Sequence, residues 1–166
     1  MLIRPESAAD LSAIRALTAR AFAGVPYSDG SEPGIVEGLR ASHALAISLV
    51  ADHEGTLVGH VAVSAVSISD NTSGWFGLGP ISVEPSYQGR GIGSKLVHAA
   101  LEELRGQGAS GCVVLGDPAY YKRFGFIHEH DLKYPGPPAE YFMALEFGSS
   151  HPHGLVKYHA AFGGVA

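Results

Sequence analysis

The sequence predicts one mixed α/β domain spanning residues 1–166. Its 166 residues suffice for a single hydrophobic core and are too few for two domains of ordinary size. Apolar residues make up 46% of the chain and charged residues 16%, a balance typical of a folded globular protein. Segments with helical spacing of apolar residues alternate with runs rich in Val, Ile and Leu, which indicates helices packed against a sheet.

The N-terminal segment predicts a short strand at residues 2–4 and a helix that ends near Phe22. Ser7 and the acid at position 10 have the spacing of a helix N-terminus. Residues 24–34 are rich in Gly, Pro, Asp and Ser and indicate a loop, and residues 35–39 support a second short helix. The first helix carries one apolar stripe at spacings of three and four, made of Leu11, Ile14, Leu17, Thr18 and Ala21.

The middle of the chain predicts an antiparallel hairpin followed by a third strand. Residues 44–52 and 57–68 are rich in Val, Ile, Leu and Ala, and a Glu-Gly turn signal at 54–55 separates them. The third strand, residues 74–83, contains Gly79 and Pro80. Proline removes a ladder donor and glycine favours a bulge, so we expect an irregular sheet there.

The C-terminal half predicts a helix, a buried strand, a short helix and two further strands. The short helix has Asp at its cap and Pro at its first position, and glycine follows both helices. The expected ranges are 91–105, 112–115, 117–124, 140–147 and 155–159.

Charge and cysteine content narrow the classes of function. The net charge is −5 and no basic run occurs, which argues against a nucleic-acid partner. Cys112 is the single cysteine, so an internal disulfide and a multi-cysteine zinc site are excluded. With neither a secretory signal pattern at the start nor 18 consecutive apolar residues, we expect a cytoplasmic protein without a membrane partner.

Residues 83–95 place a glycine-rich turn between a strand and a helix N-terminus. The glycines at 89, 91 and 93 let backbone N–H groups converge, and the helix dipole adds partial positive charge. The acid-free stretch from 85 to 101 also holds Arg90 and Lys95. The segment therefore predicts a site for a phosphate-bearing ligand.

The spacing excludes two common phosphate motifs. A dinucleotide fingerprint that starts at Gly89 requires glycine where Ser94 stands, and one that starts at Gly91 requires it where Leu96 stands. A P-loop requires Ser or Thr directly after its lysine, but Leu96 follows Lys95. A glycine-rich helix entry without a ligand is the alternative that remains open.

Two motifs resemble those of the Gcn5-related N-acetyltransferase (GNAT) superfamily. The stretch QGRGIG at 88–93 is similar to the family's Q/R-x-x-G-x-G/A loop, and VEP at 83–85 is similar to its preceding V-x-P. The stretch AYYKRFGF at 119–126 is similar to its A-x-x-Y-x-x-x-G-F segment, with one residue fewer between Ala and Tyr. The stretch IRP at 3–5, followed by Asp10, also resembles a GNAT start. Further likeness at 115–121, 124–126 and 140–145 resembles the YhbS-type branch.

The resemblance implies a fold and a co-substrate. The family fold is a mixed, mostly antiparallel sheet of six to seven strands, with helices on both faces and a splayed strand pair at the acetyl-CoA site. The pantetheine arm would pair with the main chain of Ile81 and Val83. The pyrophosphate and the turn that holds it would involve Gln88, Gly89, Arg90, Gly91, Gly93 and Ser94.

The resemblance also implies direct attack of an amine on the thioester, with Tyr121 as the general acid that protonates the leaving thiolate. Tyr120 is its nearest rival. The expected activity is transfer of an acetyl group from acetyl-CoA to a primary amine of a small molecule or peptide. A non-catalytic acyl-CoA-binding module and an acyltransferase with a carrier-protein-bound donor are the alternatives.

The general base is harder to assign. Residues 74–82 hold no acid, although some family members use one on this strand, and Glu84 is the nearest carboxylate. We assign Glu84 as the candidate base; a water chain or a histidine is the alternative. His60 lies on a strand, where packing or surface exposure is favoured over catalysis.

The remaining expectations concern metal, acceptor and assembly. The histidine pairs at 128/130 and 151/153 lack a neighbouring cysteine, and we expect no metal site. Cys112 stands in an apolar strand and is expected to be a core residue. Acceptor contacts are expected from residues 24–34 and 134–141. The sequence leaves the acceptor's identity open, and a homodimer is compatible with it.

Overall fold

A computed structural model describes residues 1–128 and 130–163, so residues 129 and 164–166 of the expected domain lie outside the described part. Its main sheet has six strands in the order β1-β2-β3-β5-β6-β8, and all neighbours are antiparallel except β5 and β6. This confirms the mixed, mostly antiparallel sheet. The strands are β1 (Leu2–Pro5), β2 (Ile47–His53), β3 (Thr56–Ala65), β5 (Trp75–Val83), β6 (Gly111–Leu115) and β8 (Phe142–Glu146).

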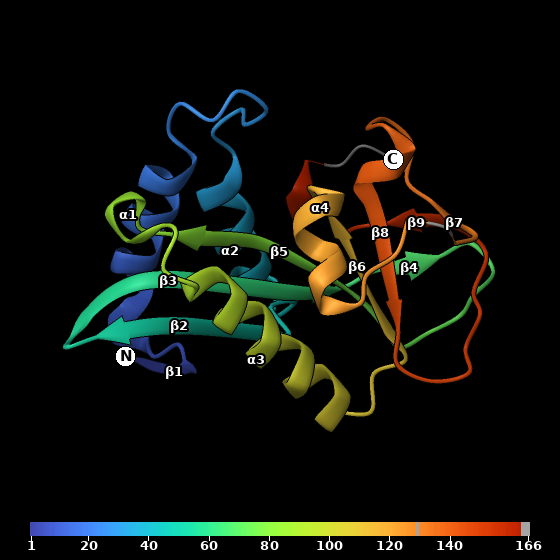
Figure 1. The fold of residues 1–166 in the computed structure, drawn as a ribbon, viewed down its shortest axis with the longest axis horizontal. Helices are drawn as coiled ribbons and strands as arrows, with labels where there is room; N and C mark the ends of the chain where they lie inside the picture. Colours follow the sequence, from blue (N-terminus) through green and yellow to red (C-terminus); the bar gives the residue numbers. More distant parts are fainter. Residues whose placement is uncertain (129, 164–166) are drawn as a thin grey trace.

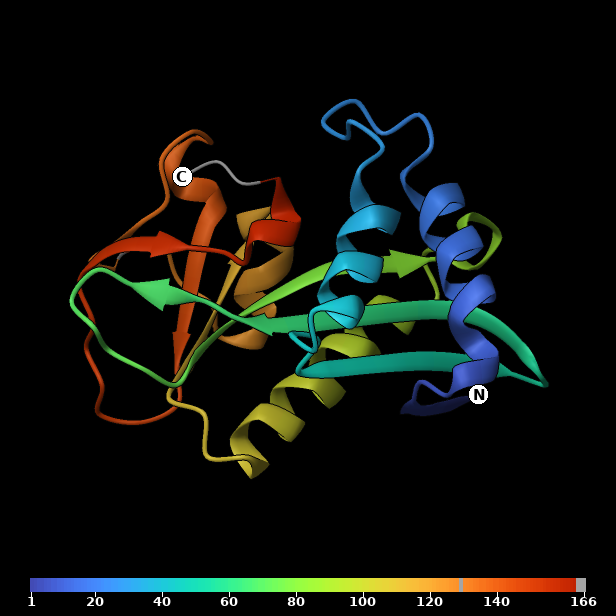
Figure 2. The same ribbon diagram turned by 180° about the vertical axis from the view of Figure 1, so that it is seen from behind.

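Helices cover both faces of this sheet (Figure 1). Helix α3 (Ile92–Gly106) and the short α4 (Pro118–Tyr121) lie on one side. Helices α1 (Leu11–Phe22) and α2 (Glu32–Ala41) lie on the other, as the reverse view in Figure 2 shows. The described 3-10 turns are Ala8–Asp10, Pro85–Tyr87, Lys122–Phe124, Ala139–Tyr141 and Ala160–Phe162.

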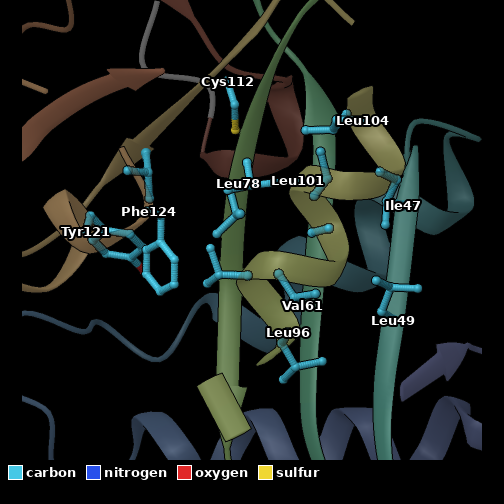
Figure 3. Packing of buried hydrophobic residues seen from close by; sticks show 14 of the residues in the cluster. Ile47, Leu49, Val61, Leu78, Leu96, Leu101, Leu104, Cys112, Tyr121 and Phe124 are labelled. Carbon is cyan, nitrogen blue, oxygen red and sulfur yellow. The ribbon is translucent and has the colours of Figure 1, made fainter. Parts of the chain in front are cut away.

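Apolar residues fill the layers between helices and sheet. Under α3 a large cluster joins Leu96, Leu101 and Leu104 of the helix to strand residues such as Val61 and Leu78 (Figure 3). The opposite cluster contains the helix residues Ile14, Leu17 and Val36 and the strand residues Val50 and Ala62. Helix α1 therefore buries Ile14, Leu17 and Thr18 of the apolar stripe that its sequence spacing predicted.

Strands β5 and β6 separate after a short common stretch. Their parallel pairing covers only Trp75–Gly111, Phe76–Cys112 and Gly77–Val113, whereas β5 continues to Val83. Figure 1 shows the two strands diverging beyond this stretch. The predicted splayed pair is confirmed, and among the described residues one edge of β5 has no strand partner from residue 78 onward.

The predicted irregularity in β5 is also confirmed. The pairing of β5 with β3 shifts between Val61 and Val63, and Ala62 therefore stands opposite the bulge at Gly79 and Pro80. The Gly79–Pro80 peptide bond is cis, and Gly79 has a φ of +134°. The bulge lies in the part of β5 that has left β6.

Several element boundaries differ from the sequence prediction. Helix α2 begins at Glu32, inside the expected loop, because a Pro and an acid suit the first turn of a helix as well as a loop. The expected strand 57–68 divides after Ala65, and β4 (Ser67–Ile68) joins β9 (Gly154–Lys157) and β7 (Leu132–Lys133) in a small second sheet. Strand β7 was not predicted, since two residues carry no periodic signal.

Candidate active site

The glycine-rich turn leads directly into α3. Gly89 and Gly91 have φ angles of +80° and +81°, a left-handed conformation that side chains disfavour. Gly91 is the N-cap of α3, so the helix begins at Ile92. The N–H groups of the first turn, those of Ile92, Gly93 and Ser94, lack intrahelical partners by helix geometry and can donate to an anion.

Side chains of the turn are held against β5 and the neighbouring 3-10 turn. The Gln88 amide donates to the carbonyl oxygen of Val83 over 3.3 Å. The Arg90 guanidinium lies 4.8 Å from the centre of the Tyr87 ring. Arg90 is exposed, so its charge adds to the positive helix terminus at the mouth of the site.

The free edge of β5 presents backbone polar groups toward the splay. The Glu84 N–H donates to the Val58 carbonyl on β3. Backbone groups alternate in direction along a strand, so those of Ile81 and Val83 face away from β3, toward the side that β6 has left. These two residues therefore offer donors and acceptors to an extended amide-bearing chain.

Tyr121 reaches the buried base of the splay. It is 8% exposed and belongs to the same cluster as Leu78 and Cys112 (Figure 3). Burial raises the pKa of its hydroxyl above the ordinary value, and the neighbouring Tyr120 adds to this effect. A Cβ added at Gly116 would overlap the Tyr121 ring, so this glycine makes room for the tyrosine. Tyr121 is a neutral proton donor at ordinary pH.

Tyr120 takes a different direction from its neighbour. Its hydroxyl oxygen lies 3.2 Å from the position that a Cβ on Gly93 would occupy, so it reaches the first turn of α3. The Arg123 guanidinium stacks on the Tyr120 ring at 4.4 Å. Tyr120 thus lies beside the glycine-rich turn, and Tyr121 lies beside the splay.

A comparison with protein families matches residues 44–128 to the acetyltransferase (GNAT) domain. The matched segment contains the free edge of β5, the glycine-rich turn and the tyrosine segment. The N-acetyltransferase YhbS of Escherichia coli K12 is 36% identical over 169 residues, which covers 98% of each chain. The chain belongs to the GNAT acetyltransferase family.

Solved GNAT structures share the whole fold. One is a GNAT family acetyltransferase from Brucella melitensis in complex with acetyl-CoA. It is 48% identical to this chain with a TM-score of 0.86, and the match covers 97% of each chain. The E. coli YhbS structure in complex with CoA is 34% identical with a TM-score of 0.88, and the match covers 97% of this chain and 91% of that one. This chain is therefore similar over nearly its full length to GNAT enzymes solved with acetyl-CoA or CoA.

Glu84, the candidate base of this GNAT chain, is paired with a cation. The Arg20 guanidinium donates to both Glu84 carboxylate oxygens, at 3.1 and 2.7 Å. The pair joins α1 to the end of β5 across 64 positions of sequence, and no pattern in the sequence indicates it. The assignment of this paired carboxylate as the base stays a prediction.

His60 is fully buried, which agrees with the expected packing position and not with the alternative of surface exposure. Its Nε2 lies 2.8 Å from the Ser48 hydroxyl. Burial lowers the pKa of the imidazole to about 4, an effect that the charge of Glu6 opposes and that of Arg40 supports. His60 is therefore neutral at pH 7.

Tyr158 is a site residue that the sequence did not reveal. Its ring covers Gly77, where a Cβ would collide with it, at the last residue of β5 that pairs with β6. Tyr134 and Phe162 lie against the same ring, at centroid distances of 5.2 and 5.0 Å. The contact links the C-terminal segment to the splay across about 80 residues, and only the folded chain shows it.

Other expectations concern the wider chain. Cys112 is fully buried as expected, and burial raises the pKa of its thiol. Within residues 1–128 and 130–163, His, Cys, Asp and Glu side chains form no group of three that could hold a metal ion. The helices of the described part are too short or too polar to cross a membrane.

Proposed function

We propose that this GNAT chain is an N-acetyltransferase that transfers the acetyl group of acetyl-CoA to a primary amine of a small molecule or peptide in the cytoplasm. The observation that carries the proposal is the free edge of β5 directly beside the glycine-rich turn. The GNAT structure from B. melitensis, 48% identical to this chain, was solved with acetyl-CoA, which supports the same donor here.

The residues present fit an extended pantetheine arm that ends in phosphates. The backbone groups of Ile81 and Val83 would pair with the arm's amides, because the β5 edge they face has no partner among the described strands. The N–H groups of Gly91, Gly93 and Ser94 would hold the pyrophosphate. Gln88 and Gly89 shape this turn, and Arg90 adds positive charge.

This arrangement fixes the direction of the arm. Its phosphates lie at the α3 end of β5, so its thioester end lies further back along the strand, toward the bulge at Gly79 and Pro80. Tyr121 lies at the base of the splay, close to that end. We therefore expect the proton donor beside the sulfur that must leave.

Acetyl-CoA supplies the thioester carbonyl that the amine attacks. Tyr121 donates its proton to the departing sulfur, and burial keeps that proton in place until it is required. A backbone N–H of β5 beside the thioester stabilises the charge that develops on the carbonyl oxygen. The side chains hold the reactants and transfer protons, and the acetyl group never forms a covalent bond to the protein.

We expect the acceptor to reach the thioester at the splay between β5 and β6, on the side of the sheet that carries α1 and α2 (Figure 2). Tyr158, with Tyr134 and Phe162, forms an aromatic wall on the small second sheet at this side of the splay. The loop between α1 and α2, with its largely exposed Tyr27, is the expected mobile contact for the acceptor.

A turnover assay tests the proposal. Purified chain is incubated with acetyl-CoA and, in turn, with an aliphatic amine, an aromatic amine, a polyamine, an amino sugar and a tripeptide with a free α-amino group. We expect amine-dependent release of CoA thiol and an acetylated product by mass spectrometry. Binding of CoA without turnover would favour a binding module, and transfer only from an acylated carrier protein would favour a different donor.

A further inference from the structure

A chain of polar side chains runs from the surface to the buried face of β3. Arg40 donates two hydrogen bonds of 2.8 Å to the Glu6 carboxylate. Ser48 donates to the same carboxylate, and its Oγ lies 2.8 Å from His60 Nε2. A surface pocket lined by Glu6, Arg40 and Ser48 opens the outer end of this chain to solvent.

The chain fixes which ring nitrogen of His60 carries hydrogen. Burial acts to raise the pKa of Glu6, but the hydrogen bonds from Arg40 and Ser48 outweigh it and lower the pKa, so the group is a carboxylate that only accepts. Ser48 has one hydroxyl hydrogen, and Glu6 receives it. The neutral His60 must therefore donate its Nε2–H to Ser48, which leaves Nδ1 with a free lone pair.

His60 Nδ1 is a buried acceptor without a partner among the described residues, and two buried hydroxyls on β3 and β5 share this condition. They are Ser64 Oγ and Ser82 Oγ, and the residues are at most 2% exposed. Ser82 stands directly opposite His60 in the pairing of β3 with β5. A buried polar atom without a partner is costly unless a ligand or water satisfies it.

These three atoms surround the bulge on one face of the sheet. His60 and Ser64 lie two residues to either side of Ala62, which stands opposite the bulge and packs beneath α1 and α2. Residues two apart on a strand share a face, so all three groups lie on the side from which the acceptor arrives. The thioester end of the cofactor arm is expected at the same bulge.

We propose that His60 is the proton acceptor of the reaction, acting through a water molecule held by Ser82, and that Ser48 and Glu6 hold His60 in the required tautomer. The inference rests on the proposed acetyl transfer and names the base of that same site. His60 does not touch the amine directly, so His60 and Ser48 are positioning residues.

The proton balance closes without a further reactant. The amine lone pair forms the C–N bond, and the C–S bond breaks with its electron pair on sulfur, which takes the Tyr121 proton. The proton that nitrogen loses passes through the water to His60 Nδ1, and Ser48 and the Glu6 carboxylate stabilise the imidazolium through Nε2–H. The imidazolium then releases its proton to solvent, and the Tyr121 phenolate takes a proton from solvent.

A matched pair at Ser48 separates a positioning role from a packing role. Ser48→Val and Ser48→Thr have the same shape and differ in the hydroxyl. With the fastest amine of the panel we expect kcat to fall about tenfold or more in Ser48→Val, with both KM values within about twofold, and to recover largely in Ser48→Thr. Thr18→Val removes a buried hydroxyl that bonds only within α1, and it serves as the control with unchanged kcat.

Two further measurements decide between His60 and Glu84. His60→Gln should lower kcat more than Glu84→Gln does. Nitrogen NMR of histidine-labelled chain should show His60 protonated on Nε2 and unprotonated on Nδ1 at pH 7. Equal kcat in the two Ser48 variants, a greater loss in Glu84→Gln, or an Nδ1–H tautomer would each overturn the role of His60 while leaving acetyl transfer intact. Absence of turnover with every amine overturns acetyl transfer itself, and the role of His60 with it.

Discussion

Burial shifts the pKa values of Tyr121 and His60 in opposite directions. It raises the pKa of the Tyr121 hydroxyl and lowers that of the His60 imidazole to about 4. Both effects arise because a charged group is costly away from water. At neutral pH the tyrosine thus keeps the proton it must give, and the histidine keeps the lone pair it must offer.

Tyr121→Phe removes the proposed acid and keeps the ring. We expect kcat to fall about 100-fold, within the range typical of general acid catalysis, with little change in the Kd for CoA. Steady-state kinetics and calorimetry measure the two effects. Tyr120→Phe is the matched control, and a larger loss of kcat in that variant would move the acid to Tyr120.

His60 also predicts a pH dependence of stability. Its pKa is about 4 in the folded chain against 6.5 for an ordinary histidine, so between these values the unfolded chain binds more protons. The free energy of unfolding should therefore fall as pH drops from 6.5 to 4, by about 3 kcal/mol from this group.

Urea unfolding of the native chain and of His60→Gln across this pH range measures the effect. The variant should show a flatter dependence of the unfolding free energy on pH, because glutamine does not titrate. Parallel curves for the two proteins would contradict the assignment of a depressed pKa to His60.

The strand, turn and helix formed by β5, the glycine-rich turn and α3 bring the binding groups together. The local pattern predicted this unit, because each glycine, the cap and the bulge depend on neighbours within a few residues. The pairing of Arg20 with Glu84 and the chain from Glu6 to His60 join distant segments. Sequence spacing carries no signal for such contacts, and therefore only the structure reveals them.

Gly91→Val tests the helix entry. A β-branched residue at a φ of +81° is strained and would redirect the N–H groups that follow, so we expect loss of measurable CoA binding. Gly106→Val makes the same change at the last residue of α3, where an added Cβ meets open space, and it should keep the native affinity. Equal affinity of the two variants in calorimetry would contradict the assignment of the turn.

Gly116, the residue after β6, makes room for the Tyr121 ring, and Gly116→Ala tests whether this space positions the tyrosine. The added methyl group would overlap the ring, so the tyrosine must move from the splay. We expect kcat to fall toward the value of Tyr121→Phe, with a smaller change in CoA affinity. A double variant with Tyr121→Phe should show less than additive loss, and full additivity would show that the two changes act separately.

The whole molecule is a sheet with helices on both faces that opens between β5 and β6. Its class, most of its elements and the splay follow from the sequence and the family resemblance, because apolar periodicity and turn residues are local. Two features do not follow from the sequence: the predicted strand divides after Ala65, and β4, β9 and β7 form a small second sheet. The two-residue strands β4 and β7 depend on their distant partner β9, and Tyr158 directly follows β9.

Calorimetric titration of the native chain with acetyl-CoA tests the central claim most directly, that the free edge of β5 and the start of α3 form a site for this donor. We predict saturable binding with one site per chain and a Kd in the micromolar range or tighter, lost in Gly91→Val and kept in Gly106→Val. Absence of binding by the native chain, or binding that Gly91→Val leaves unchanged, would contradict the account.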